Sequence, residues 1–357
     1  MKNKTLIILG GLFLLSSVGA GYIAPIIFLK WALFVTLIAL FTLGIIRDRR
    51  SKLHLTKKTY LKAILIIFLV IISITITDIF KTKKNSRLCQ GEKPEHSQYY
   101  KQNGIKNPIE FEKYIIDLHT ASRFASITPD SIEYNGINYK YLTINYEPVN
   151  YTKRILIIAS VHGDEPAGAL AIPKFLADLE KDKNKFQKIA MTILCPMNPV
   201  GLALGSRENE CGCNINRDYK VANQKETKHI MNSIKAARPN LILDLHENNG
   251  NWETCLMANT LVSNNFGELI CNELQGYSID LADYAFDLNL QIKGWHKRGA
   301  YREFINRLAG LNDLMWYGQT INIPVITVEC DQSLPLDNRI SITENTIKAI
   351  LRNIDKL

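Results

Sequence analysis

The stretch ILIIASVHGDE, residues 155–165, says most about the fold of this chain. Ile155–Ala159 is a short, wholly apolar run, which is typical of a strand buried on both faces of a sheet. The run stops just before the motif His162-Gly163-Asp164-Glu165, and Gly168–Leu179 then has the pattern of a helix. A buried strand, a polar turn and a helix form the unit from which parallel sheets are built.

The same order of elements recurs along the chain. Apolar runs at Leu241–Leu245 and Ile323–Val328 lead directly into His246 and Glu329, and Ile189–Leu194 opens into a long loop rich in Gly and Asn. In open α/β sheets, ligands bind outside the carboxyl ends of the strands. The sequence therefore predicts an α/β domain with a mostly parallel or mixed central sheet flanked by helices, and a site at that edge.

Two further elements are expected before the first buried run. The pattern predicts a helix around Phe111–Ser122, followed by a segment of alternating polarity at Ser131–Tyr146. Asn135-Gly136 divides this segment and is a strong signal for a tight hairpin turn.

The N-terminal part has a different composition. Three segments, roughly 5–23, 25–46 and 60–80, are apolar and nearly free of charge, and a helix needs roughly 20 such residues to cross a bilayer. They predict three transmembrane helices in residues 1–80, a polar linker over 81–108 and a globular domain over 109–357. A cleaved signal peptide is the alternative for the first segment, because Val18-Gly19-Ala20 resembles a cleavage site.

The charges between these segments predict an orientation. Six Lys and Arg residues lie between positions 47 and 58 and should remain in the cytoplasm under the positive-inside rule. Three spans then make the chain an integral membrane protein, with the lipid bilayer as a partner and the catalytic domain on the extracytoplasmic side. The basic residues Lys81, Lys83, Lys84 and Arg87 argue against this orientation, since they would lie just outside the membrane.

Charge and cysteine content limit the other functions. Much of the net charge of +9 lies in the membrane-flanking runs, so it requires no nucleic-acid partner. The 7 cysteines are an odd number, and any set of disulfides leaves one of them over. Export would permit one or two disulfides, whose pairing the sequence does not give. Cys211-Gly212-Cys213 lacks a second close pair, so a structural zinc knuckle is not expected.

The strand ends offer the ligands of a metal ion. His162 and Glu165 lie in one turn, in which Gly163 and Gly168 should permit tight bends, and His246 comes from another strand end. This His₂Glu set leaves a fourth position for water, as in a catalytic zinc site. Asp244, two residues before His246, is placed to orient that ligand. The alternative is chance, because an isolated H-x-x-E motif occurs in many proteins.

Two further groups would complete a hydrolytic site. Glu329 ends an apolar strand, and it is either a satisfied glutamate at the core edge or a base that deprotonates water and later protonates a leaving amine. Arg207, Asn216 and Arg217 lie on one glycine-rich loop. They are either solvated or bind a carboxylate, for which arginine supplies two parallel hydrogen bonds. One of the arginines could instead stabilise the oxyanion of a scissile carbonyl.

With these residues, the chain resembles the zinc carboxypeptidase superfamily, the carboxypeptidase A-like metallopeptidases. The resemblance runs from about Phe111 to the C-terminus and rests on four motifs in family order: H-x-x-E, N-R, D-x-H and T-x-E. The run Asn198–Leu202 and the segments that follow it are especially similar to a compact bacterial branch. That branch includes murein peptide amidases and, more distantly, succinylglutamate desuccinylases and aspartoacylases.

The resemblance implies a zinc carboxypeptidase-like catalytic domain over residues 109–357, with one zinc ion per chain. The residues that would carry the implied roles are His162, Glu165 and His246 for the metal, Glu329 as catalytic base, Arg207 for the oxyanion, Asn216 and Arg217 for the substrate's carboxylate, and Tyr301 for capping the substrate. Tyr317 is the alternative to Tyr301, because both precede Glu329.

Three functions remain open at this point. The first is a membrane-anchored zinc metallocarboxypeptidase or amidase that hydrolyses an amide bond next to a free carboxylate, in peptidoglycan-type peptides, because membrane spans favour a substrate at the cell envelope. The second is an N-acyl amino acid deacylase of the aspartoacylase or succinylglutamate desuccinylase kind, whose leaving amine is a free amino acid. The third is a non-catalytic binding protein for envelope peptides, which the complete set of ligands and base argues against.

Overall fold

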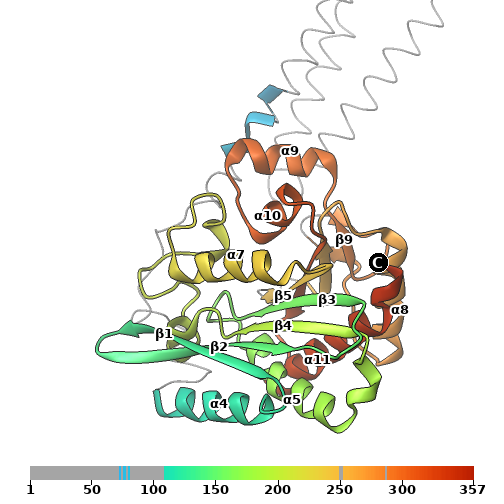
Figure 1. Ribbon diagram of the computed structural model, residues 1–357. Coiled ribbons are helices and arrows are strands. Elements are labelled where there is room, and N and C mark those ends of the chain that lie inside the picture. Colours follow the sequence, from blue (N-terminus) through green and yellow to red (C-terminus); the bar gives the residue numbers. More distant parts are fainter. Residues whose placement is uncertain (1–71, 74, 78, 81–107, 249–251, 286–287) are drawn as a thin grey trace, which may run out of the picture. The chain divides into compact units, whose positions relative to one another are not determined.

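The computed structural model describes residues 72–73, 75–77, 79–80, 108–248, 252–285 and 288–357 (Figure 1). The chain divides into two compact units, residues 1–81 with 286–288, and residues 82–285 with 289–357. In the first unit, the described positions between 72 and 80 are helical, and Thr77 Oγ1 donates to the Ser73 carbonyl at 2.9 Å.

The predicted membrane region lies almost entirely outside the described residues. Of the three predicted spans, only a few positions at the end of the last are described, and residues 81–107 of the predicted linker lie outside as well. Within the described part of the chain, no helix combines the length and the apolar composition needed to cross a bilayer.

The second unit is built around an eight-stranded mixed sheet with the order β1-β2-β4-β3-β5-β10-β6-β9. The central strands β4, β3, β5 and β10 run parallel to one another. Antiparallel pairing joins β1 to β2, β2 to β4 and β6 to β10, and β9 runs parallel to β6. The strands of this sheet are β1 (Ser126–Tyr134), β2 (Ile137–Tyr146), β3 (Lys153–Ala159), β4 (Ile189–Cys195), β5 (Leu241–Asn248), β6 (Cys255–Ala258), β9 (Trp295–Lys297) and β10 (Val325–Asp331). The short strands β7 (Tyr284–Ala285) and β8 (Leu288–Asn289) are not part of it.

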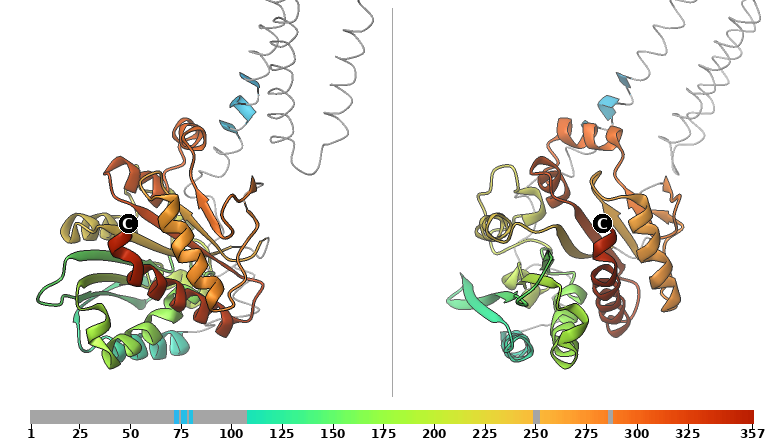
Figure 2. Two further views of the ribbon diagram at one scale, coloured as in Figure 1. Left: turned by 90° about the vertical axis from the view of Figure 1, so that its right-hand side faces the viewer. Right: turned by 45° about the vertical axis from the view of Figure 1, so that its right-hand side comes forward.

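Helices cover both faces of this sheet (Figures 1 and 2). α4 packs on α5, α5 on α11 and α11 on α8, whereas α7 lies against β3 and β4 on the opposite face. The helices are α4 (Pro108–Ala121), α5 (Ala167–Lys181), α6 (Pro199–Leu204), α7 (Lys225–Ala237), α8 (Asn264–Gly276), α9 (Ala300–Ala309), α10 (Leu314–Thr320) and α11 (Leu336–Asn353), with 3-10 turns at Lys183–Phe186, Ile215–Arg217 and Ile354–Lys356. The predicted mixed α/β architecture is confirmed.

Most of the local predictions match the observed elements. The four apolar runs form β3, β4, β5 and β10, and the predicted first helix is α4. Asn135 and Gly136 have φ angles of 51° and 79°, as a two-residue hairpin between β1 and β2 requires. The sequence did not indicate β6 or β9, because strands of 4 and 3 residues are too short to show a period.

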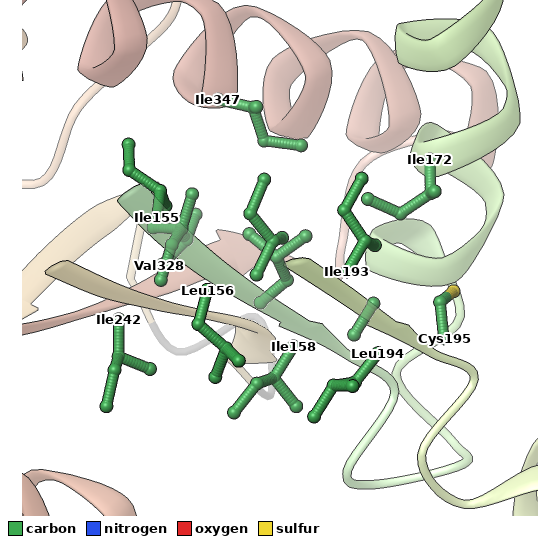
Figure 3. Packing of buried hydrophobic residues seen from close by; sticks show 14 of the residues in the cluster. Ile155, Leu156, Ile158, Ile172, Ile193, Leu194, Cys195, Ile242, Val328 and Ile347 are labelled. Carbon is green, nitrogen blue, oxygen red and sulfur yellow. The ribbon is translucent and has the colours of Figure 1, made fainter. Parts of the chain in front are cut away.

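The core explains why the strand ends are held firmly. Ile155, Leu156 and Ile158 of β3 are fully buried, as the apolar run predicts. Ile172 of α5 and Ile347 of α11 pack against one face of the sheet, while Leu156 and Ile158 point to the other (Figure 3). Each such buried side chain contributes about 1.5–3 kcal/mol. The strands that carry the candidate site therefore belong to the best-packed part of the domain.

Candidate active site

The predicted site residues gather at the carboxyl ends of the parallel strands. His162 lies three residues beyond β3, His246 lies in β5 and Glu329 lies in β10. Glu329 and His246 are paired positions in the register of their two strands. Because neighbouring strands with this register send these side chains out at the same edge, residues far apart in sequence meet there.

The turn that carries His162 depends on close backbone approach. Ser160 has a φ of 59°, in the left-handed region, so the chain changes direction directly after β3. Gly163 lies in the predicted turn after β3, whereas Gly168 lies in α5 and forms no bend, and neither residue has a positive φ. A Cβ atom at Gly163 would lie 2.0 Å from the carbonyl carbon of Gly201, and one at Gly168 would lie 2.8 Å from Leu245 Cβ. The two glycines are needed for packing of the turn against α6 and β5.

His162, Glu165 and His246, which we call the metal group, form a compact cluster. Glu165 Oε1 lies 2.9 Å from His162 Nδ1, and Glu165 Oε2 lies 2.6 Å from His246 Nδ1. The two Nδ1 atoms are 3.1 Å apart. One ligand atom from each residue lies within 4.8 Å of the others, and all three side chains are buried. The geometry could hold a metal ion.

The outer hydrogen bonds of the two histidines fit this interpretation. His162 Nε2 lies 3.1 Å from Asn214 Oδ1, and His246 Nε2 lies 3.0 Å from Asp244 Oδ2. Both partners are oxygen acceptors, so each Nε2 carries a hydrogen, and with a metal bound each Nδ1 would turn its lone pair to the ion. Two imidazole nitrogens and a carboxylate then converge, a donor set that suits zinc. Asp244 lies where the sequence predicted an orienting residue, whereas Asn214 was not predicted.

Glu165 supplies a buried negative charge between the two histidines of the metal group. Burial, together with the charge of nearby Arg207, lowers the pKa of His162 to about 3. Burial also opposes ionisation of Glu165, but His162 and His246 hold its pKa well below the usual value. For His246, Asp244 and Glu165 outweigh burial and raise the pKa well above its usual value. Glu165 is therefore a buried but ionised carboxylate, as a metal ligand must be.

Arg207 approaches the metal group from the loop that follows α6. Its Nη1 donates to Glu165 Oε1 at 2.7 Å, and its side chain is 37% exposed. The guanidinium thus lies between the buried cluster and solvent, where a substrate would arrive.

Glu329 lies beside the metal group, and its pKa is raised above the usual value of a glutamate. Burial raises its pKa to about 7, His246 and Arg207 act to lower it, and Glu165 acts to raise it. A carboxyl group that titrates near neutral pH can both accept and return a proton, which is what general base–acid chemistry requires.

Asn216 and Arg217, the N-R pair, lie on a 3-10 turn, and Asn216 contacts the start of α10. Asn216 Oδ1 accepts a hydrogen bond from Leu314 N at 3.1 Å, and Arg217 Nη1 donates to the Asn216 carbonyl at 2.7 Å. Burial lowers the pKa of Arg217 to about 10, Asp313 opposes this shift, and Arg207 adds to it. Electrostatic interaction with Arg207 and Glu329 shows that the N-R pair shares the electrostatic environment of the metal group.

Asp313 and Arg298 were missed by the sequence analysis. Asp313 caps α10 by accepting from Trp316 N at 2.8 Å, and both of its oxygens pair with the guanidinium of buried Arg298. The capping pattern, an aspartate before Leu314, was visible in the sequence. No local signal indicates Arg298, which reaches Asp313 from the end of β9.

The two candidate tyrosines lie on different helices. Tyr301 is on α9 and is 43% exposed. Tyr317 is on α10, and its ring stacks on that of Tyr219 with centroids 5.8 Å apart. Burial raises the pKa of Tyr219 well above its usual value, and the charges of Asp244 and Asp313 add to the effect. Tyr317 therefore stacks on a tyrosine that lies within the electrostatic influence of Asp244, beside the metal group, and of Asp313, beside the N-R pair.

Part of the chain matches a known enzyme family. Residues 151–288 match the family described as the succinylglutamate desuccinylase/aspartoacylase catalytic domain. The matched segment contains the metal group, Arg207 and the N-R pair, and it ends before Tyr301 and Glu329. The sequence matches no curated protein.

Several solved structures share the fold. A metallo-carboxypeptidase from Burkholderia cenocepacia has 16% identity and a TM-score of 0.52, over 70% of this chain and 69% of that one. One from Pseudomonas aeruginosa, in complex with (2-guanidinoethylmercapto)succinic acid, has 14% identity and a TM-score of 0.51, over 69% of each chain. A protein from Shewanella amazonensis SB2B, described as a candidate metallopeptidase, has 17% identity and a TM-score of 0.54, over 69% and 92%. At these sequence identities, the similarity shows a shared fold and nothing further.

These matches agree with the geometry of the strand ends. The matched segment includes the predicted metal ligands, which lie after β3 and in β5 of the mixed sheet. These findings bear out the predicted resemblance: the chain is similar to succinylglutamate desuccinylases and aspartoacylases over residues 151–288, and it shares the fold of metallo-carboxypeptidases.

Proposed function

We propose that this protein is a membrane-anchored zinc metallocarboxypeptidase or amidase that hydrolyses an amide bond next to a free carboxylate. The observation that carries the proposal is the convergence of His162, Glu165 and His246, with Glu329 in register beside His246. A binding protein would not need a carboxyl group of raised pKa at that position, whereas a hydrolase does.

The metal group would hold one zinc ion, which supplies Lewis-acid polarisation of the scissile carbonyl and makes water more acidic. Glu329 takes a proton from the attacking water and returns it to the nitrogen of the leaving amine. Its raised pKa allows both transfers near neutral pH. Asp244 keeps the His246 ring in the orientation that directs Nδ1 into the site.

Three loop residues would bind the substrate around this centre. Arg207 donates to the oxyanion that develops on the carbonyl, from a position already within hydrogen-bond distance of Glu165. Asn216 and Arg217 bind the free carboxylate and so determine which amide bond reaches the metal. This carboxylate requirement distinguishes the proposed activity from that of a general peptidase.

The capping tyrosine stays a prediction with two candidates. The sequence favours Tyr301, while stacking of Tyr317 on Tyr219 supports the alternative. Replacing each by Phe and comparing kcat for the same substrate separates them, since only the capping residue loses a hydroxyl that touches substrate. If neither change lowers kcat, no tyrosine of this pair has the role.

The proposed substrate is a peptide of peptidoglycan type on the extracytoplasmic side of the membrane. Support comes from the three apolar N-terminal segments with their basic loop, and from Cys213, which is disulfide-bonded. Disulfides persist in oxidising compartments outside the cytoplasm.

The experiment that tests the proposal uses the zinc-loaded full chain in detergent. Muropeptides and short peptides are offered with either a free or an amidated C-terminus, and products are identified by mass spectrometry. The proposal predicts cleavage next to the free carboxylate only. Turnover that ignores the carboxylate, or none on any member of the set, would contradict it.

A second candidate is an N-acyl amino acid deacylase, which the family match over residues 151–288 favours. The metal group and Glu329 would have the same roles, but the leaving amine would be a free amino acid. Release of acetate or succinate from N-acetyl or N-succinyl amino acids, with muropeptides left intact, would establish this activity instead.

A further inference from the structure

The α9 helix has an exposed apolar face. Phe304 is 51% exposed and Leu308 is 52% exposed, and residues four apart lie side by side on a helix. Tyr301, one turn before Phe304, lies on the same side. Large apolar side chains clustered in this way mark a surface that binds something.

The exposed face is distinct from the face by which α9 packs on the domain. Ile305, Asn306 and Ala309 are buried and hold the helix in place. Figure 1 shows α9 at the periphery of the domain, outside α10. Packing in the core therefore does not explain why positions 304 and 308 carry large apolar side chains.

The exposed charged side chains of α9 are all basic. Arg307 is exposed beside Phe304, and Arg302 is exposed in the first turn, on the side of the helix that carries Asn306. Glu303, the single acid of this helix, is largely buried and lies 4.0 Å from Arg298. The outward surface of α9 is thus apolar and basic, which is the composition of a helix that lies in the interface of an anionic bilayer.

We propose that the α9 face formed by Phe304 and Leu308, with Arg307 beside it and Arg302 in the first turn of the helix, docks on the surface of an anionic lipid bilayer. The apolar side chains enter the boundary between headgroups and acyl chains, while the guanidinium groups bind lipid phosphates. A helix of this size binds lipid weakly alone. This step rests on the proposed function: N-terminal segments that anchor the chain would keep the helix at high local concentration near the membrane.

Docking has a consequence for the site, because α9 leads directly into α10. The first amide of α10, Leu314 N, holds Asn216, and Asp313 pairs with Arg298 at the base of α9. A docked α9 therefore keeps the N-R pair close to the lipid surface, where substrate attached to the membrane would be presented. The lipid contact itself goes beyond the proposed function and is measured without catalysis.

The test is a tryptophan placed on the α9 face of the full chain. Phe304→Trp is reconstituted in vesicles of neutral lipid with an anionic component, and quenching by brominated lipid is compared with quenching by aqueous acrylamide. Val149→Trp is the matched control, because Val149 is 97% exposed in the turn between β2 and β3. The wild-type signal is subtracted from both.

The proposal predicts that brominated lipid removes about half or more of the added emission at position 304 and leaves that at position 149 unchanged. The double variant Arg302→Gln/Arg307→Gln, in the Phe304→Trp background, should lose the dependence on anionic lipid. Acrylamide quenching at position 304 equal to that at position 149 would overturn the proposal. Protection from both quenchers would also overturn it, because protein, and not lipid, would then cover the face.

Discussion

The metal group and the N-R pair lie in one site but are positioned in different ways. His246 and Glu329 belong to parallel strands whose register fixes them, and His162 follows a third such strand. Asn216 and Arg217 lie on a 3-10 turn that is held from outside, by an amide of α10 and the charge of Asp313. The first region is defined by backbone pairing in the core, and the second by side chains from distant segments.

This difference predicts two kinds of response to substitution. Changes in the strand-borne residues should remove the chemical step or the metal outright, because the surrounding backbone does not move to compensate. Changes around the N-R pair should weaken substrate binding in graded fashion, since each contact restricts the loop only in part. Four experiments test this contrast.

The largest effect is expected for Glu329→Gln. This change removes the group that accepts the proton of water, and general base catalysis contributes about 10²–10⁴-fold. We expect kcat to fall about a thousandfold, with the zinc content unchanged. Steady-state kinetics and elemental analysis of the same sample provide the measurement. Retention of a tenth or more of the activity would mean that the base is another residue.

The pH dependence should follow the same carboxyl group. Burial raises the pKa of Glu329 to about 7, and the base works only when deprotonated. Therefore kcat/KM should rise with pH and level off above 7, and at pH 5 it should be about a hundredfold below its plateau. Zinc content measured at each pH separates this effect from loss of metal. A flat profile between pH 5 and 8 would contradict the role of Glu329.

Arg217→Ala should have a smaller effect that depends on the substrate. Loss of a charged hydrogen-bonding partner costs about 1.5–3 kcal/mol. We expect kcat/KM to fall about tenfold to a hundredfold for peptides with a free carboxylate, mainly through KM. Peptides with an amidated C-terminus are the control. For these peptides, kcat/KM should be the same in the wild type and in the variant. A uniform loss on both substrates would place the carboxylate contact elsewhere.

Asp313→Asn should give the smallest change. Asparagine still caps α10, but it no longer neutralises Arg298 or faces Arg217, so the N-R pair loses part of its support. A rise in KM of about threefold to tenfold is expected with little change in kcat. Asp337→Asn, at the exposed start of α11, is the matched control and should change neither constant. A fall in kcat with constant KM would assign Asp313 to the chemical step.

The contrast between the two regions also describes what the sequence could predict. The apolar runs before His246 and Glu329 predict two buried strands, and the polar residue at the end of each run predicts a site residue. In a parallel sheet these strand ends meet, so the proximity of the two side chains followed from the fold class. Three residues act through contacts with distant parts of the chain: Asn214, Arg298 and Asp313. The sequence around each of them does not predict which residue it contacts. The packing role of Gly163 was not predicted for the same reason, because it depends on the close approach of Gly201 from a distant part of the sequence.

The central claim is that the strand ends hold a zinc ion. Elemental analysis of the purified full chain tests it directly, with His162→Ala beside the wild type. His229→Asn is the matched control, because His229 contacts Thr143 and lies apart from the metal group. We predict about one zinc ion per chain in the wild type and in His229→Asn, and its loss from His162→Ala. Folded wild type without metal, or His162→Ala with as much as the wild type, would contradict the account.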